Sequence, residues 1–302
     1  MERPRSSLLK STFRQSLDFL LFSNIFIALC AVAQAAVTYH LLGARCDEYV
    51  LALLFCCTLA LYNFSIFLSK PANPKKSPFK RVRWTFAHYR MMITLTLIAV
   101  LSIVPLLFFL STASKLLLLF LGIIAIAYNL PLFTMNDQKF GLRNVPGLKL
   151  FLIALIWSLS CVLLPIVEIS HKHQFAVSAS DTIVLIAKRF LFICAITVPF
   201  DIRDLFQDRK YELKTIPVVF GERKAYIFCQ ILLLIYLLLL LFFTNSFDAH
   251  FAALTLTIIL TGWLIFKAEF KKNEYYYFLY LDGTMILQFL MILIMEDLWK
   301  LF

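Results

Sequence analysis

Glycine and charged residues are both scarce in this sequence. Seven of the 302 residues are glycine, and charged side chains make up 16% of the chain, whereas hydrophobic residues make up 61%. One water-soluble core cannot bury so large an apolar fraction, so the composition excludes a soluble globular protein. The scarcity of glycine also argues against a transporter that is built on broken membrane helices.

The cysteines are few and show no pattern of paired or metal-binding residues. There are seven, an odd number, and all but Cys46 lie inside apolar runs without the spacing of metal ligands. We therefore interpret them as small apolar packing residues rather than as a disulfide framework or a metal site.

Long apolar runs fill most of the chain. They have 18 to 24 residues, which suits helices that cross a hydrocarbon layer about 30 Å thick. The sequence predicts an all-α integral membrane protein with one nine-helix domain over residues 19–302, preceded by a cytoplasmic segment at residues 1–18. We place its transmembrane helices at residues 19–42, 50–68, 91–110, 116–133, 148–167, 182–200, 225–243, 249–266 and 276–295.

The basic residues are distributed unevenly between the connections. If the N-terminus is cytoplasmic, most of the lysines and arginines outside the helices lie on the cytoplasmic side, which is the usual bias of membrane proteins. The net charge of +11 is then explained by topology and by anionic lipids, not by nucleic acid. We expect a multi-pass protein of a bacterial inner membrane, with its C-terminus outside and enlarged cytoplasmic loops after helices two and six, at about 69–90 and 201–224.

The second enlarged loop begins with three carboxylates. Asp201, Asp204 and Asp208 are spaced three and four residues apart, so a helix continuing from the sixth span would present all three on one face. Mg2+ relieves the repulsion within such a group and commonly takes one or two carboxylates together with phosphate oxygens. The alternative is a solvated helix in which the nearby arginines and lysines are the counter-ions.

This stretch resembles a known motif. Asp204, Asp208, Lys214 and the strip TIPVVFG that ends at Gly221 are similar to the second aspartate motif of the UbiA superfamily of intramembrane prenyltransferases. In that family a DxxxD pair precedes a basic residue and a T-x-P-x-x-x-G-like strip. The nine-helix layout with two enlarged cytoplasmic loops also fits the family.

The resemblance implies a reaction and a set of site residues. Family members bind an isoprenyl diphosphate through Mg2+ and transfer the prenyl group to a small membrane-soluble acceptor, in some members aromatic. The resemblance assigns Asp204 and Asp208 to catalysis and metal binding, and Asp201 to a supporting role in metal binding. Substrate-binding roles fall on Asn63, Lys214, Arg143, Lys149, Arg81, Arg83, Tyr128 and Asp282.

The first aspartate motif of the family is incomplete in this chain. Asn63 is present, but Phe67 occupies the position of the aspartate, and no acidic residue occurs between Glu48 and Asp137. The loop at 69–90 is strongly basic instead. Its lysines and arginines either bind the diphosphate oxygens or contact anionic lipids.

Two further alternatives remain open from the sequence. Asp282 lies inside the ninth span, where an ionisable group is costly, so it either faces a pocket or pairs with another helix. The whole chain is either a prenyltransferase or a non-catalytic protein of the same fold that binds an isoprenoid phosphate or acts in a membrane assembly.

Overall fold

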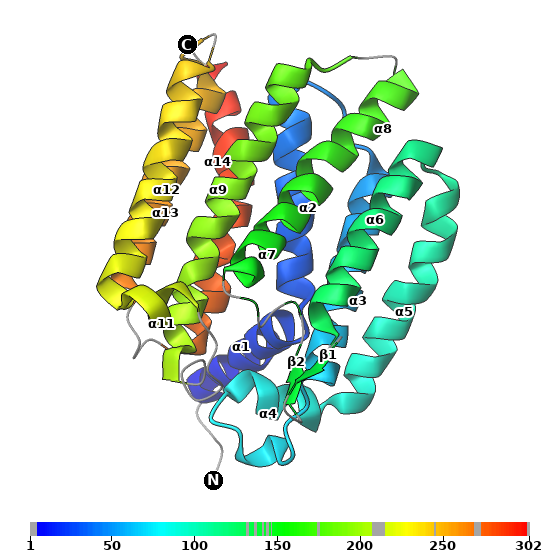
Figure 1. Ribbon diagram of the computed structural model, residues 1–302, viewed down its shortest axis with the longest axis vertical. Coiled ribbons are helices and arrows are strands. Elements are labelled where there is room, and N and C mark those ends of the chain that lie inside the picture. The colour runs from blue at the N-terminus through cyan, green and yellow to red at the C-terminus, as the bar shows by residue number, and fades with distance from the viewer. Residues whose placement is uncertain are drawn as a thin grey trace.

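The computed structural model describes residues 5–130, 133–135, 138–140, 142, 145, 147–173, 176–206, 215–244, 246–268 and 273–300. Long helices run side by side in a bundle (Figure 1). In chain order they are α2 (Ile25–Leu41), α3 (Glu48–Leu68), α5 (Tyr89–Phe108), α6 (Thr112–Asn129), α7 (Leu148–Ser158) with α8 (Leu164–His173), α9 (Ala179–Arg203), α12 (Glu222–Phe242), α13 (Ala249–Lys267) and α14 (Gly283–Trp299).

Most of these helices are long and apolar enough to cross a membrane. Seven meet this condition outright, a bent pair at the N-terminus would be an eighth, and the apolar helix Thr112–Tyr128 is shorter. Two of the seven contain a π-helical turn, at Leu159–Leu163 between α7 and α8 and at Tyr276–Leu281 before α14. The prediction of an all-α, multi-pass membrane protein is therefore confirmed, and the count of nine spans stays a prediction.

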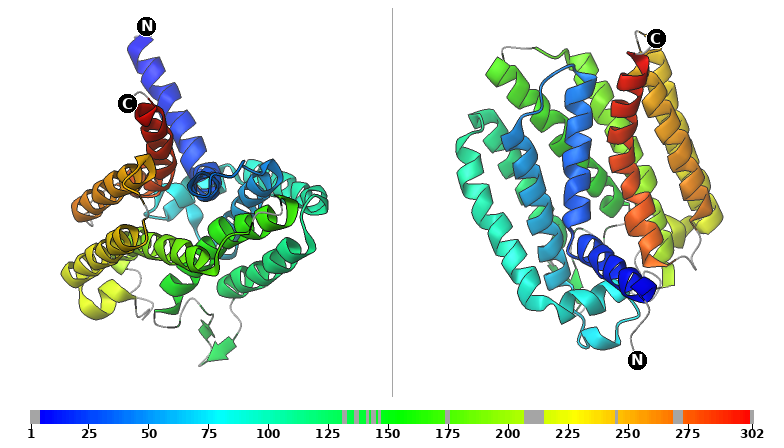
Figure 2. Two further views of the ribbon diagram at one scale, coloured as in Figure 1. Left: turned by 90° about the horizontal axis from the view of Figure 1, so that it is seen from above. Right: turned by 180° about the vertical axis from the view of Figure 1, so that it is seen from behind.

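The first predicted span is divided by a bend. The helix α1 (Arg5–Phe22) lies obliquely across one end of the bundle (Figure 2), and its axis makes an angle of 63° with α2. Asn24 stands at the bend with φ of 69°, in the left-handed region that asparagine tolerates better than most residues. The straight membrane helix thus begins at Ile25, not at Phe19, because Phe22 is packed against Trp84, Tyr275 and Phe278.

The shorter elements gather at the end of the bundle that carries the N-terminus (Figure 1). They are the turn of 3-10 helix Pro74–Lys76, α4 (Lys80–Ala87), α11 (Ile216–Phe220) and a hairpin of β1 (Phe133–Met135) and β2 (Gln138–Phe140). The C-terminus lies at the opposite end. The described parts of both enlarged connections predicted from the sequence therefore lie at the same end of the helix bundle.

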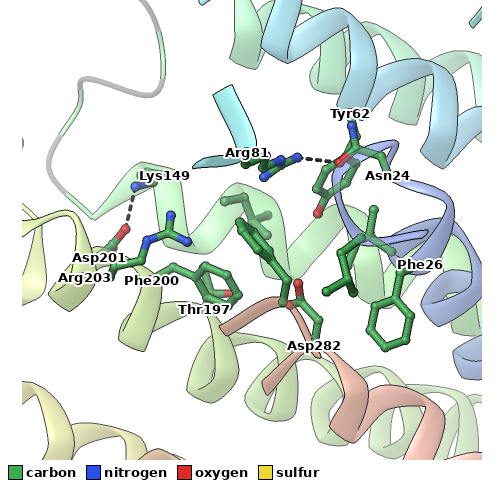
Figure 3. Close-up of a pocket in the computed structure, with 14 residues that line it drawn as sticks. Asn24, Phe26, Tyr62, Arg81, Lys149, Thr197, Phe200, Asp201, Arg203 and Asp282 are labelled. Atoms are coloured by element: carbon green, nitrogen blue, oxygen red, sulfur yellow. Dashed lines mark hydrogen bonds and ion pairs between the residues drawn. The ribbon is translucent and has the colours of Figure 1, made fainter. Parts of the chain in front are cut away.

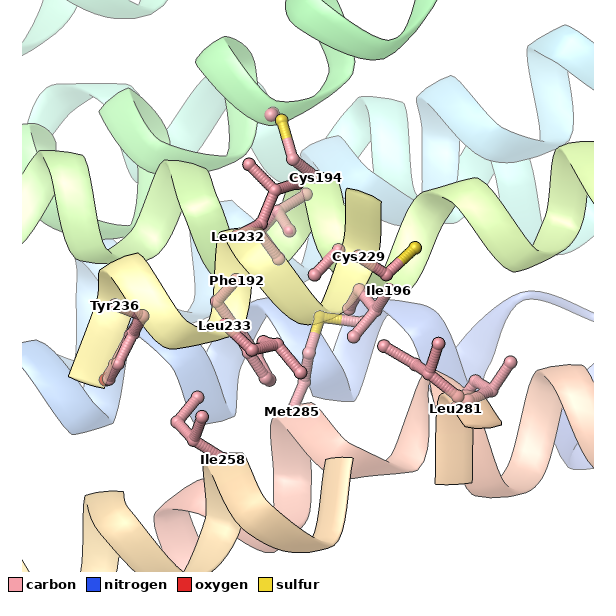
Figure 4. Packing of buried hydrophobic residues seen from close by; sticks show 14 of the residues in the cluster. Phe192, Cys194, Ile196, Cys229, Leu232, Leu233, Tyr236, Ile258, Leu281 and Met285 are labelled. Carbon is pink, nitrogen blue, oxygen red and sulfur yellow. The ribbon is translucent and has the colours of Figure 1, made fainter. Parts of the chain in front are cut away.

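The main apolar core lies between α2, α7, α9, α12, α13 and α14 (Figure 4). Cys194 and Cys229 are buried in it with Phe192, Leu233 and Met285. All seven cysteines are free, and four are fully enclosed, which confirms their interpretation as packing residues. The core holds these six helices together and leaves the space beside α3 and α6 less filled.

Candidate functional site

A polar cavity of about 170 Å³ opens at the end of the bundle that carries α4 (Figure 3). We call it the polar cavity. It collects four residues that the sequence had marked separately, namely Arg81, Lys149, Asp201 and Asp282. The other polar lining residues are Asn24, Tyr62, Thr197 and Arg203, and the apolar ones include Phe26, Phe200 and Phe278.

The start of α4 fixes the position of Arg81. The Glu274 carboxylate accepts hydrogen bonds from the backbone N–H groups of Lys80 at 2.5 Å and of Arg81 at 2.9 Å. A carboxylate at this place satisfies donors that the helix leaves free and is favoured by the helix dipole. The Lys80 ammonium also reaches both carboxylate oxygens of Asp18 in α1, at 2.7 and 2.8 Å.

Arg81, Asn24 and Asn63 form a hydrogen-bonded chain across three helices. A guanidinium N–H of Arg81 donates to the Asn24 side-chain oxygen, and the Asn24 amide donates to the Asn63 oxygen at 2.6 Å. Asn63 is buried. Two donors of this chain, Nε of Arg81 and Nδ2 of Asn63, have no acceptor in the structure. Unpaired buried donors are costly, so an acceptor group from a ligand would be stabilised here.

Arg203 supplies a third such donor. Its Nε and Nη2 bind the two oxygens of Asp204 at 2.8 and 2.9 Å, while Nη1 is buried without an acceptor. The guanidinium also lies over the rings of Phe200, Tyr277 and Phe278, between 5.2 and 5.3 Å from their centroids. Stacking of this kind holds a planar guanidinium in one orientation.

Asp201 and Asp204 do not share a site. Asp201 lines the polar cavity and receives a hydrogen bond of 2.5 Å from the Lys149 ammonium. Asp204 lines a second cavity of about 170 Å³, which also contacts Arg81, Arg203 and Glu274. Asp204 is the residue that caps the end of α9, and its carboxylate binds the neighbouring Arg203 rather than Lys149.

The described residues contain no group of three histidine, cysteine or carboxylate side chains that could hold a metal ion. Asp208, Lys214 and Arg143 lie outside the described residues, so their assigned roles stay predictions. Arg83 is exposed and donates to the backbone oxygens of Ser77 and Pro78, at 2.5 and 2.9 Å, and it lines neither cavity.

The polar cavity adjoins an apolar space between α3, α6 and α7. Tyr62 and Ile153 line the polar cavity and also a cavity of about 220 Å³ that extends to Tyr128. A deeper cavity of about 110 Å³ shares Tyr62 and Trp157 with the cavity that extends to Tyr128, and it reaches Leu54 and Leu118. We call this connected space the apolar channel. Tyr128, one of the predicted site residues, lines this channel.

The site combines cations and carboxylates: Arg81, Lys149 and Arg203 line the polar cavity together with Asp201 and Asp282. Burial and the neighbouring charge of Arg203 lower the pKa of Arg81 to about 10, so it remains a cation at neutral pH. Asp282 lines the same cavity where η4 (Tyr276–Leu281) meets α14. Its place in the cavity agrees with the predicted pocket role more than with helix pairing.

Sequence reasoning missed Asn24 and Glu274 and treated Arg203 only as a counter-ion. The signal for Asn24 was present as the polar pair Ser23–Asn24 inside an apolar run. No local pattern marks Glu274, because its partners are nearly 200 positions away in the chain.

Comparison with known proteins gives the fold its name. No protein-family model and no curated protein sequence matches the chain. Two solved structures of a UbiA homolog from Archaeoglobus fulgidus are similar. The first, bound to GPP and Mg2+, has a TM-score of 0.61 at 14% identity over 94% of this chain and 99% of that one. The second, bound to DMAPP and Mg2+, has a TM-score of 0.58 at 15% identity over 94% and 100%.

The apo structure of a UbiA homolog from Aeropyrum pernix K1 is also similar, with a TM-score of 0.54 at 14% identity. The matched region covers 93% of this chain and 96% of that one. The similarity extends over almost the whole length of each protein, although few residues are identical. The chain therefore has the UbiA fold, as the motif around Asp204 predicted.

Proposed function

We propose that this protein binds an isoprenyl diphosphate and transfers the isoprenyl group to a small membrane-soluble acceptor. One observation carries the proposal: a polar cavity lined by Arg81 and Arg203, which have donors without acceptors, adjoins an apolar channel and shares Tyr62 and Ile153 with it. An isoprenyl diphosphate matches this arrangement, because its charged diphosphate suits the polar cavity and its hydrocarbon tail suits the apolar channel. The solved UbiA homologs bound to GPP or DMAPP support this assignment.

The diphosphate is held by cations and amide donors of the described residues. Arg81 and Arg203 line the cavity, and Nε of Arg81 and Nη1 of Arg203 are donors without an acceptor. Charge-assisted hydrogen bonds from guanidinium groups to phosphate are short and strong. Lys149 lies in the same cavity and adds positive charge, part of which Asp201 neutralises.

The carboxylates present allow one Mg2+ near the second cavity. Asp204 lines that cavity, where its oxygens bind Arg203, and Asp208 would be the second carboxylate, as the motif implies. A site of one or two carboxylates, completed by phosphate oxygens and water, is common for this ion. Mg2+ bound there would neutralise charge on the departing pyrophosphate.

The residues of the chain do the remaining work. When the allylic C–O bond breaks, Arg81 and Arg203 donate to the leaving diphosphate and stabilise its charge. Phe26, Phe200, Phe278 and the walls of the apolar channel keep water from the allylic cation. We place Asp282 and Tyr62 beside the acceptor, because both line the polar cavity and Tyr62 also lines the channel.

The metal dependence is tested by Asp204→Asn and Asp208→Asn. We expect each to weaken Mg2+-dependent binding of geranyl diphosphate by at least about tenfold, because each removes a carboxylate that binds the ion. Calorimetric titration of the purified protein, with and without Mg2+, measures the effect. Asp297→Asn is the matched control, since Asp297 is an exposed carboxylate on α14 paired with Lys300. Equal affinity with and without Mg2+ would contradict the metal site.

A non-catalytic binding function is the second candidate, favoured by Phe67. This residue packs edge-on against Tyr89, with ring centroids 5.5 Å apart, at the place where the family carries an aspartate. Release of pyrophosphate in the presence of a phenolic acceptor such as 4-hydroxybenzoate distinguishes the two. Tight binding of the diphosphate without any release, with this and other acceptors, would establish a binder.

A further inference from the structure

The apolar channel has a defined depth. Its lining advances in the same direction along three segments: from Ser65 to Leu54 on α3, from Tyr128 to Leu118 on α6, and from Ile153 on α7 to Ser160 in the π-helical turn that follows it. Ten residues separate Tyr128 from Leu118, which at 1.5 Å per residue corresponds to about 15 Å. The channel therefore extends well beyond the reach of a single five-carbon unit attached to a diphosphate in the polar cavity.

Gly122 lies at the passage into the deeper part of the channel. It is a lining residue of the deep cavity and not of the one that reaches Tyr128, and it stands six residues, or about 9 Å, along α6 from Tyr128. A Cβ atom at Gly122 would meet no other atom within 4 Å. The side chain that is missing here thus leaves open space where the channel continues toward Leu118.

We propose that Gly122 determines the length of isoprenoid tail that the protein accepts, and that its substrate carries a long tail of farnesyl or geranylgeranyl size. This inference rests on the proposed function and makes it more specific. A tail of that length passes Gly122 and buries its last units against Leu54, Cys57 and Leu118. A dimethylallyl or geranyl tail ends before this point and leaves the deep cavity unfilled.

The test is Gly122→Leu. Leucine favours the helix and meets no clash at Cβ, so the variant should fold. Its side chain projects into the channel and displaces the end of a long tail. We expect the affinity for geranylgeranyl diphosphate to fall by at least about tenfold, whereas the affinity for geranyl diphosphate changes by less than about threefold. Calorimetric titration of the four diphosphates from dimethylallyl to geranylgeranyl measures the profile.

Ile123→Phe is the matched control. Ile123 is the next residue on α6, but 59% of it is exposed toward the membrane, so added volume there should leave all four affinities unchanged. An unaltered length profile in Gly122→Leu would overturn the role of Gly122 while leaving the proposed function intact. Wild-type protein that prefers dimethylallyl diphosphate would overturn the long-tail substrate. Failure of the wild type to bind any of the four would overturn the proposed function itself.

Discussion

Replacing Arg81 by alanine should reduce the affinity for geranyl diphosphate by about 100-fold or more. Loss of one partner from a buried, charged hydrogen bond commonly has an effect of this size. Arg81 lines both the polar cavity and the second cavity, which Asp204 also lines. It contributes a positive charge and an Nε donor that has no acceptor. Titration calorimetry in detergent, at constant Mg2+ concentration, measures the loss.

Two variants separate this role from general effects of charge and folding. Arg81→Lys keeps the charge but loses the planar fork of donors, so we expect an intermediate affinity. Arg83→Ala removes an exposed arginine two residues further along α4 and should bind as the wild type does. If Arg81→Ala binds geranyl diphosphate normally while its thermal unfolding is unchanged, the assignment of the headgroup to this cavity is wrong.

The lowered pKa of Arg81 gives the same prediction a pH dependence. Because its pKa is about 10 in the free protein, Arg81 is charged below that pH and loses its proton as the pH rises through it. The charge of Arg81 should therefore leave the affinity for geranyl diphosphate constant between pH 7 and 9. Above pH 10 the affinity should decline as Arg81 loses its proton. Arg81→Ala should lack the decline at high pH.

The sequence predicted the helices well because lipid imposes a simple demand on them. Each membrane helix must be apolar over a long run, so the ends of α3, α9 and α12 lie within a few residues of the predicted bounds. The bend before Ile25 was missed because apolar residues continue on both sides of it. What turns the chain there is the packing of Phe22 against Trp84 of α4 and Phe278 of η4, which are distant in sequence.

The site was predicted as a list of residues and not as an arrangement. Asp201 and Asp204 were expected on one face, but α9 ends between them, and each finds a different cation. The partner of Asp201 is Lys149, which is 52 positions away. Helix periodicity carries no information about where a helix ends against its neighbours or which distant charge meets it. The polar cavity could therefore be recognised only from the folded chain.

Asn24 should be the residue whose replacement affects stability and binding together. Asn24→Ala places an ordinary side chain at φ of 69° and leaves Asn63 and Arg81 without their shared partner. The backbone conformation costs about 1–2 kcal/mol for alanine and each of the two unpaired buried groups about 1–3 kcal/mol, so we expect a loss of about 3–8 kcal/mol in the free energy of unfolding. A lowered midpoint of thermal unfolding, with weakened binding of geranyl diphosphate, would show it.

Asn24→Gly separates the effect of the backbone conformation from the effect of the lost side-chain hydrogen bonds. Glycine adopts the left-handed conformation at no steric cost, so this variant should regain about 1 kcal/mol relative to Asn24→Ala. It still lacks the amide that holds the Arg81 guanidinium beside the polar cavity, so binding should remain weak. If Asn24→Gly instead binds geranyl diphosphate as tightly as the wild type, the Glu274 carboxylate and the start of α4 suffice to position Arg81. The bend at Asn24 would then serve only to turn α1 across the end of the bundle, and α4 with Glu274 would position Arg81 without help from Asn24.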